Sequence, residues 1–376
     1  MSDDDQLITI LEIGVRGESS DVVNGWMVRA IEVFEKHAEF STTPVKSFLG
    51  RQVHALPITR VQNLLSVAKK TTAQDALSWY RQISSVNEAS MRIVGKVHGL
   101  HVDRPHKLSN DFTFSPLWLM PPSPNTSALQ QSSVGMPPGY TFPCLMYFEI
   151  ENVQADEMLA GHEYFLQVVD EMRRTLNAFV LAGEGAPIIT ETWSEFVDDE
   201  MNKATGRSWQ ASSTDGMMPS RYAHMTDEAL DWMERYLSTP SSVQNACDVA
   251  LERLNIATRR LASGDKALDG CICLESVLSG KSRGELTHRL AVRTALLLGK
   301  DLEERQKVAQ RVREFYQLRS NMVHGSSKAK SDKSNAIAED GLSLCREVIS
   351  AIISHQTHPD PETWELTGGP PWNRLH

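Results

Sequence analysis

The sequence contains no long apolar run and no basic leader. No apolar stretch approaches the roughly 18 to 20 residues that a membrane-spanning helix needs. A hydrophobic content of 41% and a charged content of 23% are ordinary for a soluble globular protein. The opening residues, MSDDDQLITI, are acidic and lack both the basic and the cleavable apolar segment of a secretory signal. We therefore expect a soluble, cytoplasmic protein with no membrane partner.

Cysteine is scarce, with 5 residues in a chain of 376. The cysteines lie among apolar neighbours, without the paired short spacings of a zinc site or a disulfide framework. They are Cys144, Cys247, Cys271, Cys273 and Cys345. We expect all of them to be buried free thiols.

Common catalytic and metal-binding motifs are also missing. The sequence has no G-x-S-x-G elbow and no H-E-x-x-H element. The stretch ESVLSGKS ends like a phosphate-binding loop, but Glu275 stands where that loop needs glycine. The stretch HGLHVDRPH offers four residues that can bind metal, but their spacing matches no metal site that we can justify: His98, His101, Asp103 and His106. The sequence thus predicts neither a metal site nor a cofactor.

The charge is acidic overall and unevenly spread. The net charge of -10 argues against a surface coated for nonspecific nucleic-acid binding. Between Lys281 and Lys333, however, 13 Lys and Arg face 6 Asp and Glu, which gives a local charge of +7. The clearest basic region of the chain therefore surrounds residues 316–325.

The first half of the chain mixes strand-like and helix-like segments. Those that predict strands are 7–15 and 144–153, and those that predict helices are 61–68 and 156–181. The Pro, Ser and Gly residues of 120–140 predict a loop. We therefore predict an α+β domain over 1–220, whose role is unknown; sensing and RNA recognition are both open.

Most segments of the second half have helical spacing. A polar stretch rich in turn-forming residues, 202–224, indicates a domain boundary. From 225 to 355 we predict a bundle of about five helices, with breaks at 263–265, 279–284, 299–301 and 325–334. The Pro- and Gly-rich residues 356–376 predict an irregular tail.

One predicted helix of this bundle carries an arginine on its apolar face. With 100° per residue from Val308, the apolar residues within about 80° of zero are Val312, Phe315, Leu318, Met322 and Val323. Arg319 falls at about 20° on the same wheel, in the middle of the face that should be buried.

His324 falls at about 160°, so a straight helix would keep it apart from Arg319. Either the helix ends or bends near His324, or a second chain brings such groups together. Gly325 is a suitable C-terminal cap, which favours the first option. A structural alternative also stands, in which Arg319 pairs with a buried carboxylate and the helix dipole favours His324.

Three stretches, DKALDGCICLESVLSG, ELTHRLAVRTALLLG and FYQLRSNMVHG, resemble in order and spacing the Apea-like branch of the HEPN domains. The similarity covers roughly residues 243–355. It implies a helical bundle that forms a homodimer, in which the R-x4-6-H element of each chain faces a shared cleft. It also implies metal-independent RNA cleavage, as in many members, by a toxin or an anti-phage defence effector. Arg319 and His324 match that element.

Other polar positions of the resemblance have supporting roles. Ser320 follows the arginine, where catalytic members often carry Asn, Asp or His. Glu275 and Arg293 look like characteristic positions with a mainly structural role. Glu275 lies in an apolar run and needs a partner if it is buried, for which Arg293 and Arg319 are the candidates.

The chemistry of RNA cleavage suits these residue types. The ribose 2′-hydroxyl attacks the adjacent phosphate, so one group must accept its proton and another must protonate the leaving 5′-oxygen. Histidine can do either near neutral pH, and a guanidinium binds phosphate oxygens in a bidentate way. We therefore predict that Arg319 stabilises the developing charge and that His324 moves the proton.

Four further basic residues could guide the RNA backbone into the cleft, although a solvated helix face and a charged loop explain them equally well: Arg311, Arg313, Lys328 and Lys330. The rival function is a noncatalytic dimeric HEPN module that binds RNA or a protein, with Arg319 as a structural residue. The sequence does not identify the trigger, whether ligand or protein.

Overall fold

The computed structural model describes residues 3–17, 20–42, 45–53, 56–133, 143–155, 159–205, 210–211, 217–219, 221–280, 285–323, 332–358 and 360–373. The chain forms two compact units, and each is built from separate segments. The first contains Met1–Lys96, Asp111–Asp170 and Glu191–Ser212, and the second contains Val97–Asn110, Glu171–Thr190 and Ser213–His376.

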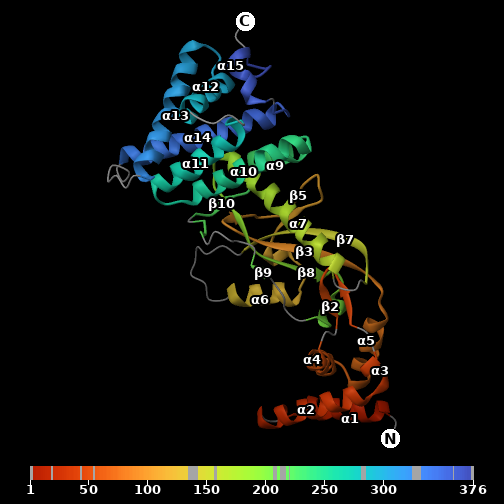
Figure 1. The fold of residues 1–376 in the computed structure, drawn as a ribbon. Helices are drawn as coiled ribbons and strands as arrows, with labels where there is room; N and C mark the ends of the chain where they lie inside the picture. The colour runs from red at the N-terminus through yellow and green to blue at the C-terminus, as the bar shows by residue number, and fades with distance from the viewer. Residues whose placement is uncertain are drawn as a thin grey trace. The chain divides into compact units, whose positions relative to one another are not determined.

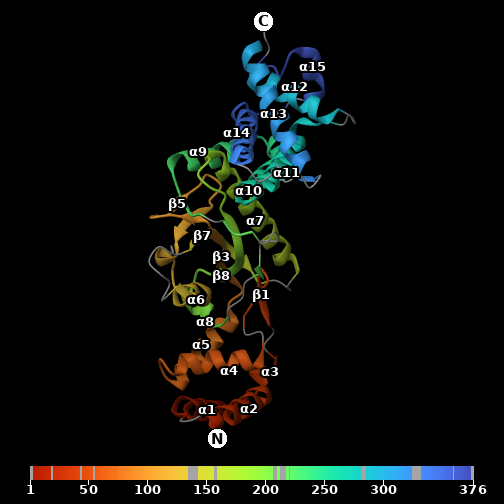
Figure 2. The same cartoon turned by 90° about the vertical axis from the view of Figure 1, so that its left-hand side faces the viewer.

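The first unit begins with helices. They are α1 (Asp3–Arg16), α2 (Ser20–Lys36), α3 (Ala38–Thr42), α4 (Pro57–Ala68) and α5 (Ala73–Ser85). Helices α1, α2 and α4 pack against one another (Figure 2). The prediction of a strand over 7–15 is wrong, because Leu7, Ile10 and Leu11 are buried at helical spacing. The predicted helix over 61–68 is confirmed within α4.

A sheet follows these helices. Its strands are β3 (Glu88–His98), β6 (Thr113–Pro116), β7 (Cys144–Gln154), β8 (Ile188–Phe196) and β9 (Gln210–Ala211), which lie side by side in the order β6, β7, β3, β8, β9. Strand β6 runs antiparallel to β7 with Phe114 opposite Met146. A separate hairpin joins β1 (Lys46–Phe48) to β2 (Arg51–Val53). The strand predicted over 144–153 is confirmed as β7.

The remaining elements of this stretch of sequence are η1 (Leu117–Leu119), α6 (Pro124–Ser133), α7 (Leu159–Asn177), η2 (Ala178–Ala182) and α8 (Asp199–Lys203). Of these, η2 and the end of α7 from residue 171 on belong to the second unit. The helix predicted over 156–181 is confirmed from residue 159 on by α7 and η2, and residues 156–158 lie outside the described residues. The loop predicted over 120–140 is wrong at α6. Proline is tolerated in the first turn of a helix, and Ala128 and Leu129 supply a buried side.

The second unit is mainly helical. Its helices are α9 (Asp227–Ser238), α10 (Ser241–Arg259), α11 (Ser263–Leu278), α12 (Leu286–Leu298), α13 (Leu302–Val323) and α14 (Asp332–Ser354), followed by η4 (Pro361–Thr363) and α15 (Trp364–Thr367). Three short strands also belong to it, β4 (Leu100–His101), β5 (His106–Lys107) and β10 (Ala223–His224). The predicted order, an α+β part followed by a helical part, is confirmed at this level.

Helices α11, α13 and α14 contact one another, α10 packs on α11 and α14, and α12 packs on α13 (Figure 1). The residues described between 226 and 355 form six α-helices, one more than predicted. The predicted break at 263–265 is misplaced, because α11 begins at Ser263 and the interruption lies just before it. Among the helices of the described residues, none has the length and apolar character of a membrane span.

Candidate functional site

The predicted apolar face of α13 is buried at Val312, Phe315 and Leu318, whereas Met322 is half-buried. Val312 and Phe315 are fully covered, and Leu318 is buried as well. The ring of Phe315 lies against Gly270 of α11 and Gly341 of α14, where neither helix has a side chain to hinder it. Arg319 lies one turn after this ring, at the end of the helix that adjoins His324.

Glu275 of α11 is the partner of Arg319. The Nη1 atom of Arg319 donates to Oε1 of Glu275 over 2.9 Å, and the two side chains are 30% and 24% exposed. Glu275 is half-buried, and of its two candidate partners it pairs with Arg319. Because both groups retain contact with water, the ion pair does not bury the guanidinium completely.

Tyr316 completes this cluster. Its hydroxyl donates to the same Oε1 atom of Glu275 over 2.7 Å. Its ring centroid lies 5.6 Å from Cζ of Arg319, within the range of a cation–π contact. Burial raises the pKa of Tyr316 strongly, and the nearby Cys271 and Glu275 add to the increase, so the hydroxyl stays a donor. Glu275 and Tyr316 thereby fix the orientation of the guanidinium.

The guanidinium keeps hydrogen-bonding capacity. Arginine has five N–H donors in a planar fork, and among the described residues only Nη1 of Arg319 has an acceptor, which is Glu275. The remaining donors could contact an anion such as a phosphate.

Arg293 lies in a different place, with a structural role. It is almost fully buried, and its Nη1 atom donates to the carbonyl oxygens of Leu278 and Ser279, each over 2.8 Å. Its Nε atom donates to Glu365 over 2.9 Å. The carbonyl groups at the end of a helix have no partner within the helix, so Arg293 satisfies the C-terminal end of α11.

The other predicted residues are not gathered around Arg319. Arg311 is held by Asp340 and Glu347 of α14, with Nε to Oδ2 of Asp340 at 3.0 Å and Nη2 to Oε1 of Glu347 at 3.0 Å. Hydrogen bonds to Glu347 raise the pKa of the Arg311 guanidinium above its ordinary value. Arg313 is exposed, and Ser320 is half-buried in the last turn of α13. The predicted residues His324, Lys328 and Lys330 lie outside the described residues.

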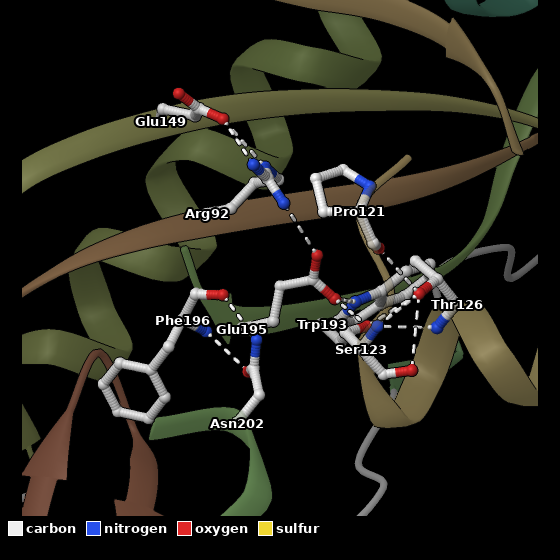
Figure 3. Close-up of polar contacts among 9 residues, drawn as sticks. All are labelled: Arg92, Pro121, Ser123, Thr126, Glu149, Trp193, Glu195, Phe196 and Asn202. Carbon is white, nitrogen blue, oxygen red and sulfur yellow. Dashed lines mark hydrogen bonds and ion pairs between the residues drawn. The ribbon is translucent and has the colours of Figure 1, made fainter. Parts of the chain in front are cut away.

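The first unit holds a second polar cluster, which the sequence did not indicate (Figure 3). At its centre is Glu195 of β8, whose side chain is 1% exposed. Its Oε2 atom accepts from the Ser123 hydroxyl over 2.6 Å and from the Trp193 indole over 2.8 Å, and its Oε1 atom accepts from Arg92 over 3.2 Å. A buried carboxylate needs such partners, and here all of them are hydrogen-bond donors.

This cluster fastens the start of α6 to the sheet. Thr126 Oγ1 accepts from the backbone N–H of Ser123 over 2.7 Å, and Ser123 Oγ accepts from the N–H of Thr126 over 3.1 Å. Arg92 also donates to Glu149 of β7 over 2.6 Å (Figure 3). Because the donors and acceptors satisfy one another, we interpret the cluster as structural. The spacing of residues along the sequence could not reveal this cluster, because Ser123 and Glu195 are 72 positions apart.

Comparison of the chain with protein-family models, with curated proteins and with solved structures finds no match.

Proposed function

We propose that the protein is a metal-independent endoribonuclease of the HEPN type, which acts in the cytoplasm as a homodimer, as a toxin or an anti-phage defence effector. The observation that carries the proposal is Arg319. Its guanidinium is partly exposed, is oriented by Glu275 and Tyr316, and lies on α13 five positions before His324. An arginine with only a structural task would be expected to use its donors within the protein, as Arg293 does.

The proposed reaction is an internal transfer. The ribose 2′-oxygen forms a bond to phosphorus while the bond from phosphorus to the 5′-oxygen breaks, which leaves a 2′,3′-cyclic phosphate and a 5′-hydroxyl. One histidine accepts the 2′-hydroxyl proton and another group returns a proton to the 5′-oxygen. His324 takes one of these tasks, the partner chain supplies the other, and Arg319 neutralises the charge that develops on the phosphate oxygens.

Among the basic residues proposed to guide RNA, the surroundings differ. Arg313 is exposed and available for a phosphate, whereas the guanidinium of Arg311 is bonded to two carboxylates. Within α13 we therefore assign the contact with the RNA backbone to Arg313 in the first place.

The role of the guanidinium is tested by measuring the rate of tRNA cleavage in EDTA. The proteins compared are the wild type, Arg319→Lys and Arg319→Ala. We expect Arg319→Ala to lower the rate about 100-fold or more, as loss of a charge-stabilising donor does. We expect Arg319→Lys to retain only a small part of the wild-type cleavage rate, because an ammonium cannot bind two oxygens in one plane. Thermal melting shows whether each variant is folded. Wild-type rates in folded Arg319→Ala would rule this site out.

The ion pair with Glu275 favours one alternative, a noncatalytic HEPN module that binds RNA or a protein through the same unit. In that case Arg319 only joins α13 to α11. Expression in a host separates the two functions: toxicity that disappears with His324→Ala indicates the nuclease, and equal growth with and without His324 indicates the binding module.

A further inference from the structure

The second unit brings together three metal-binding side chains from distant parts of the sequence. His101 and Asp103 belong to the stretch HGLHVDRPH, and His224 lies more than 100 positions later. One ligand atom from each lies within 4.8 Å of the others. Because His224 lies outside the stretch HGLHVDRPH, the spacing of residues within that stretch could not indicate it.

Backbone pairing explains why the two histidines meet. Strands β4 and β10 run parallel, with Leu100 opposite Ala223 and His101 opposite His224. The backbone N–H of Met225 donates to the carbonyl of His101 over 3.0 Å, which fixes this register. Residues opposite each other in a ladder point to the same face, and the two imidazole rings are 5.0 Å apart, edge to face.

The carboxylate of Asp103 lies on the same face because side chains alternate along an extended chain. Side chains two positions apart lie on one side of an extended chain, so Asp103 follows His101, while Leu100 and Val102 are buried on the other side. Nε2 of His101 is 2.9 Å from Oδ1 of Asp103. The side chain of Asp103 is 84% exposed and that of His101 is 18% exposed. The cluster is therefore open to solvent on the side of Asp103.

A second cluster, formed by two carboxylates and one histidine in the first unit, shows which surroundings argue against a metal: Asp4, His37 and Glu39. There Arg81 donates to Glu39 over 2.8 Å and to Asp4 over 2.8 Å. The guanidinium neutralises both carboxylates and would repel a cation. Around His101, Asp103 and His224, no lysine or arginine among the described residues forms a hydrogen bond or an ion pair with any of the three.

We propose that His101, Asp103 and His224 bind a divalent cation of the Zn²⁺ class. Two imidazoles and one carboxylate are a known ligand set for zinc, and three protein ligands leave a fourth position for water. Zinc lies about 2.0 to 2.2 Å from such nitrogen and oxygen atoms, so the three groups have to close by roughly 1 Å around the ion. The bound ion would join the segment before β5 to the segment before α9.

Calorimetric titration of the full-length, metal-free protein with Zn²⁺ tests this proposal. We expect one ion per chain in the wild type. Its affinity should fall at least about 100-fold in His224→Ala and in Asp103→Asn, more than the loss of a group that only orients a ligand costs. The matched control is His106→Ala, which removes a histidine of the same stretch outside the cluster and should leave the affinity unchanged. Circular dichroism without metal shows that each variant is folded.

Titration with Co²⁺ identifies the ligand atoms. We expect visible d–d bands without a sulfur-to-cobalt charge-transfer band, because the site contains no thiolate. Absence of binding, equal affinity in His224→Ala, or a sulfur band would each overturn the proposal. These readouts do not involve RNA cleavage, so they stand apart from the proposed nuclease activity.

Discussion

At the scale of single residues, Glu275 explains why an arginine is tolerated on the apolar face of α13. One carboxylate oxygen accepts from both Tyr316 and Arg319, so the two polar groups on this part of α13 share one acceptor. The sequence predicted that Glu275 needs a cation. It could not choose between Arg293 and Arg319, because that choice depends on which helix packs beside α11.

Tyr316→Phe should lower the free energy of unfolding by about 1 kcal/mol, the usual value of one hydrogen bond. The variant removes the hydroxyl but keeps the buried ring, so packing should not change. Urea denaturation measures the difference. Tyr164→Phe is the control, because Tyr164 is 40% exposed, and we expect no change there. Equal loss in both variants would contradict the role given to the Tyr316 hydroxyl.

Glu195 should be far more sensitive than its neighbour Glu149. Glu195→Gln removes a charge that is 1% exposed and leaves Arg92 short of a buried partner, so we expect a loss of about 3 kcal/mol. Glu149→Gln removes a carboxylate that is 48% exposed, so we expect less than about 1 kcal/mol. Urea denaturation of both variants measures the two losses of unfolding free energy. A larger loss in Glu149→Gln than in Glu195→Gln would contradict the central role given to Glu195.

At the scale of elements, Phe315 sets how closely α11, α13 and α14 pack. The ring fits where Gly270 and Gly341 have no side chains. Periodicity predicted that Phe315 is buried. It could not show that two glycines from other helices receive the ring, because each glycine is helical and carries no local sign of this contact.

Gly270→Ala should destabilise the helical unit by about 2 kcal/mol. The added Cβ would lie 2.6 Å from Cζ of Phe315, and overpacking of this kind costs about 1 to 3 kcal/mol. Gly25→Ala in α2 is the matched control, because no atom lies within 4 Å of the added group. Alanine should stabilise that helix by up to about 1 kcal/mol. Thermal melting of both variants should give shifts of opposite sign, and a neutral Gly270→Ala would refute the packing argument.

The elements that the sequence predicted well have a long, regular pattern, as β7 and α7 do. The errors have local causes. The apolar residues of α1 are dense enough to resemble a strand, although Leu7 and Leu11 face the core at helical spacing. Helix α6 lies in a segment rich in proline and serine. Its start depends on the hydrogen bonds between Ser123 and Thr126, which composition does not reveal.

At the scale of the whole molecule, contacts between distant segments escaped prediction. Residues 97–110 and 171–190 belong to the same compact unit as 213–376. The pairing of β4 with β10 involves two residues from each strand, too few to leave a pattern in the sequence. His224 therefore had no visible connection to His101 until the fold was known.

All five thiols should be unreactive in the folded protein. Each cysteine is buried and free, as the sequence predicted. Burial raises the pKa of Cys247 to about 12 and that of Cys144 further, so these thiols stay protonated at neutral pH, and only the thiolate reacts. Titration with an aromatic disulfide at pH 8 should detect almost no thiol in the native state and five after denaturation. Rapid reaction of a native thiol would contradict this packing.

The most direct test of the proposed function is the chemistry of RNA ends. Total RNA and tRNA are incubated in EDTA with the wild type, with His324→Ala, and with His288→Ala as a matched control, because His288 is an exposed histidine of α12. We expect the wild type and His288→Ala to leave 2′,3′-cyclic phosphate ends, and His324→Ala to leave the RNA intact. Cleavage by His324→Ala at the wild-type rate, fragments with 3′-hydroxyl ends, or intact RNA with every protein would contradict the proposed nuclease.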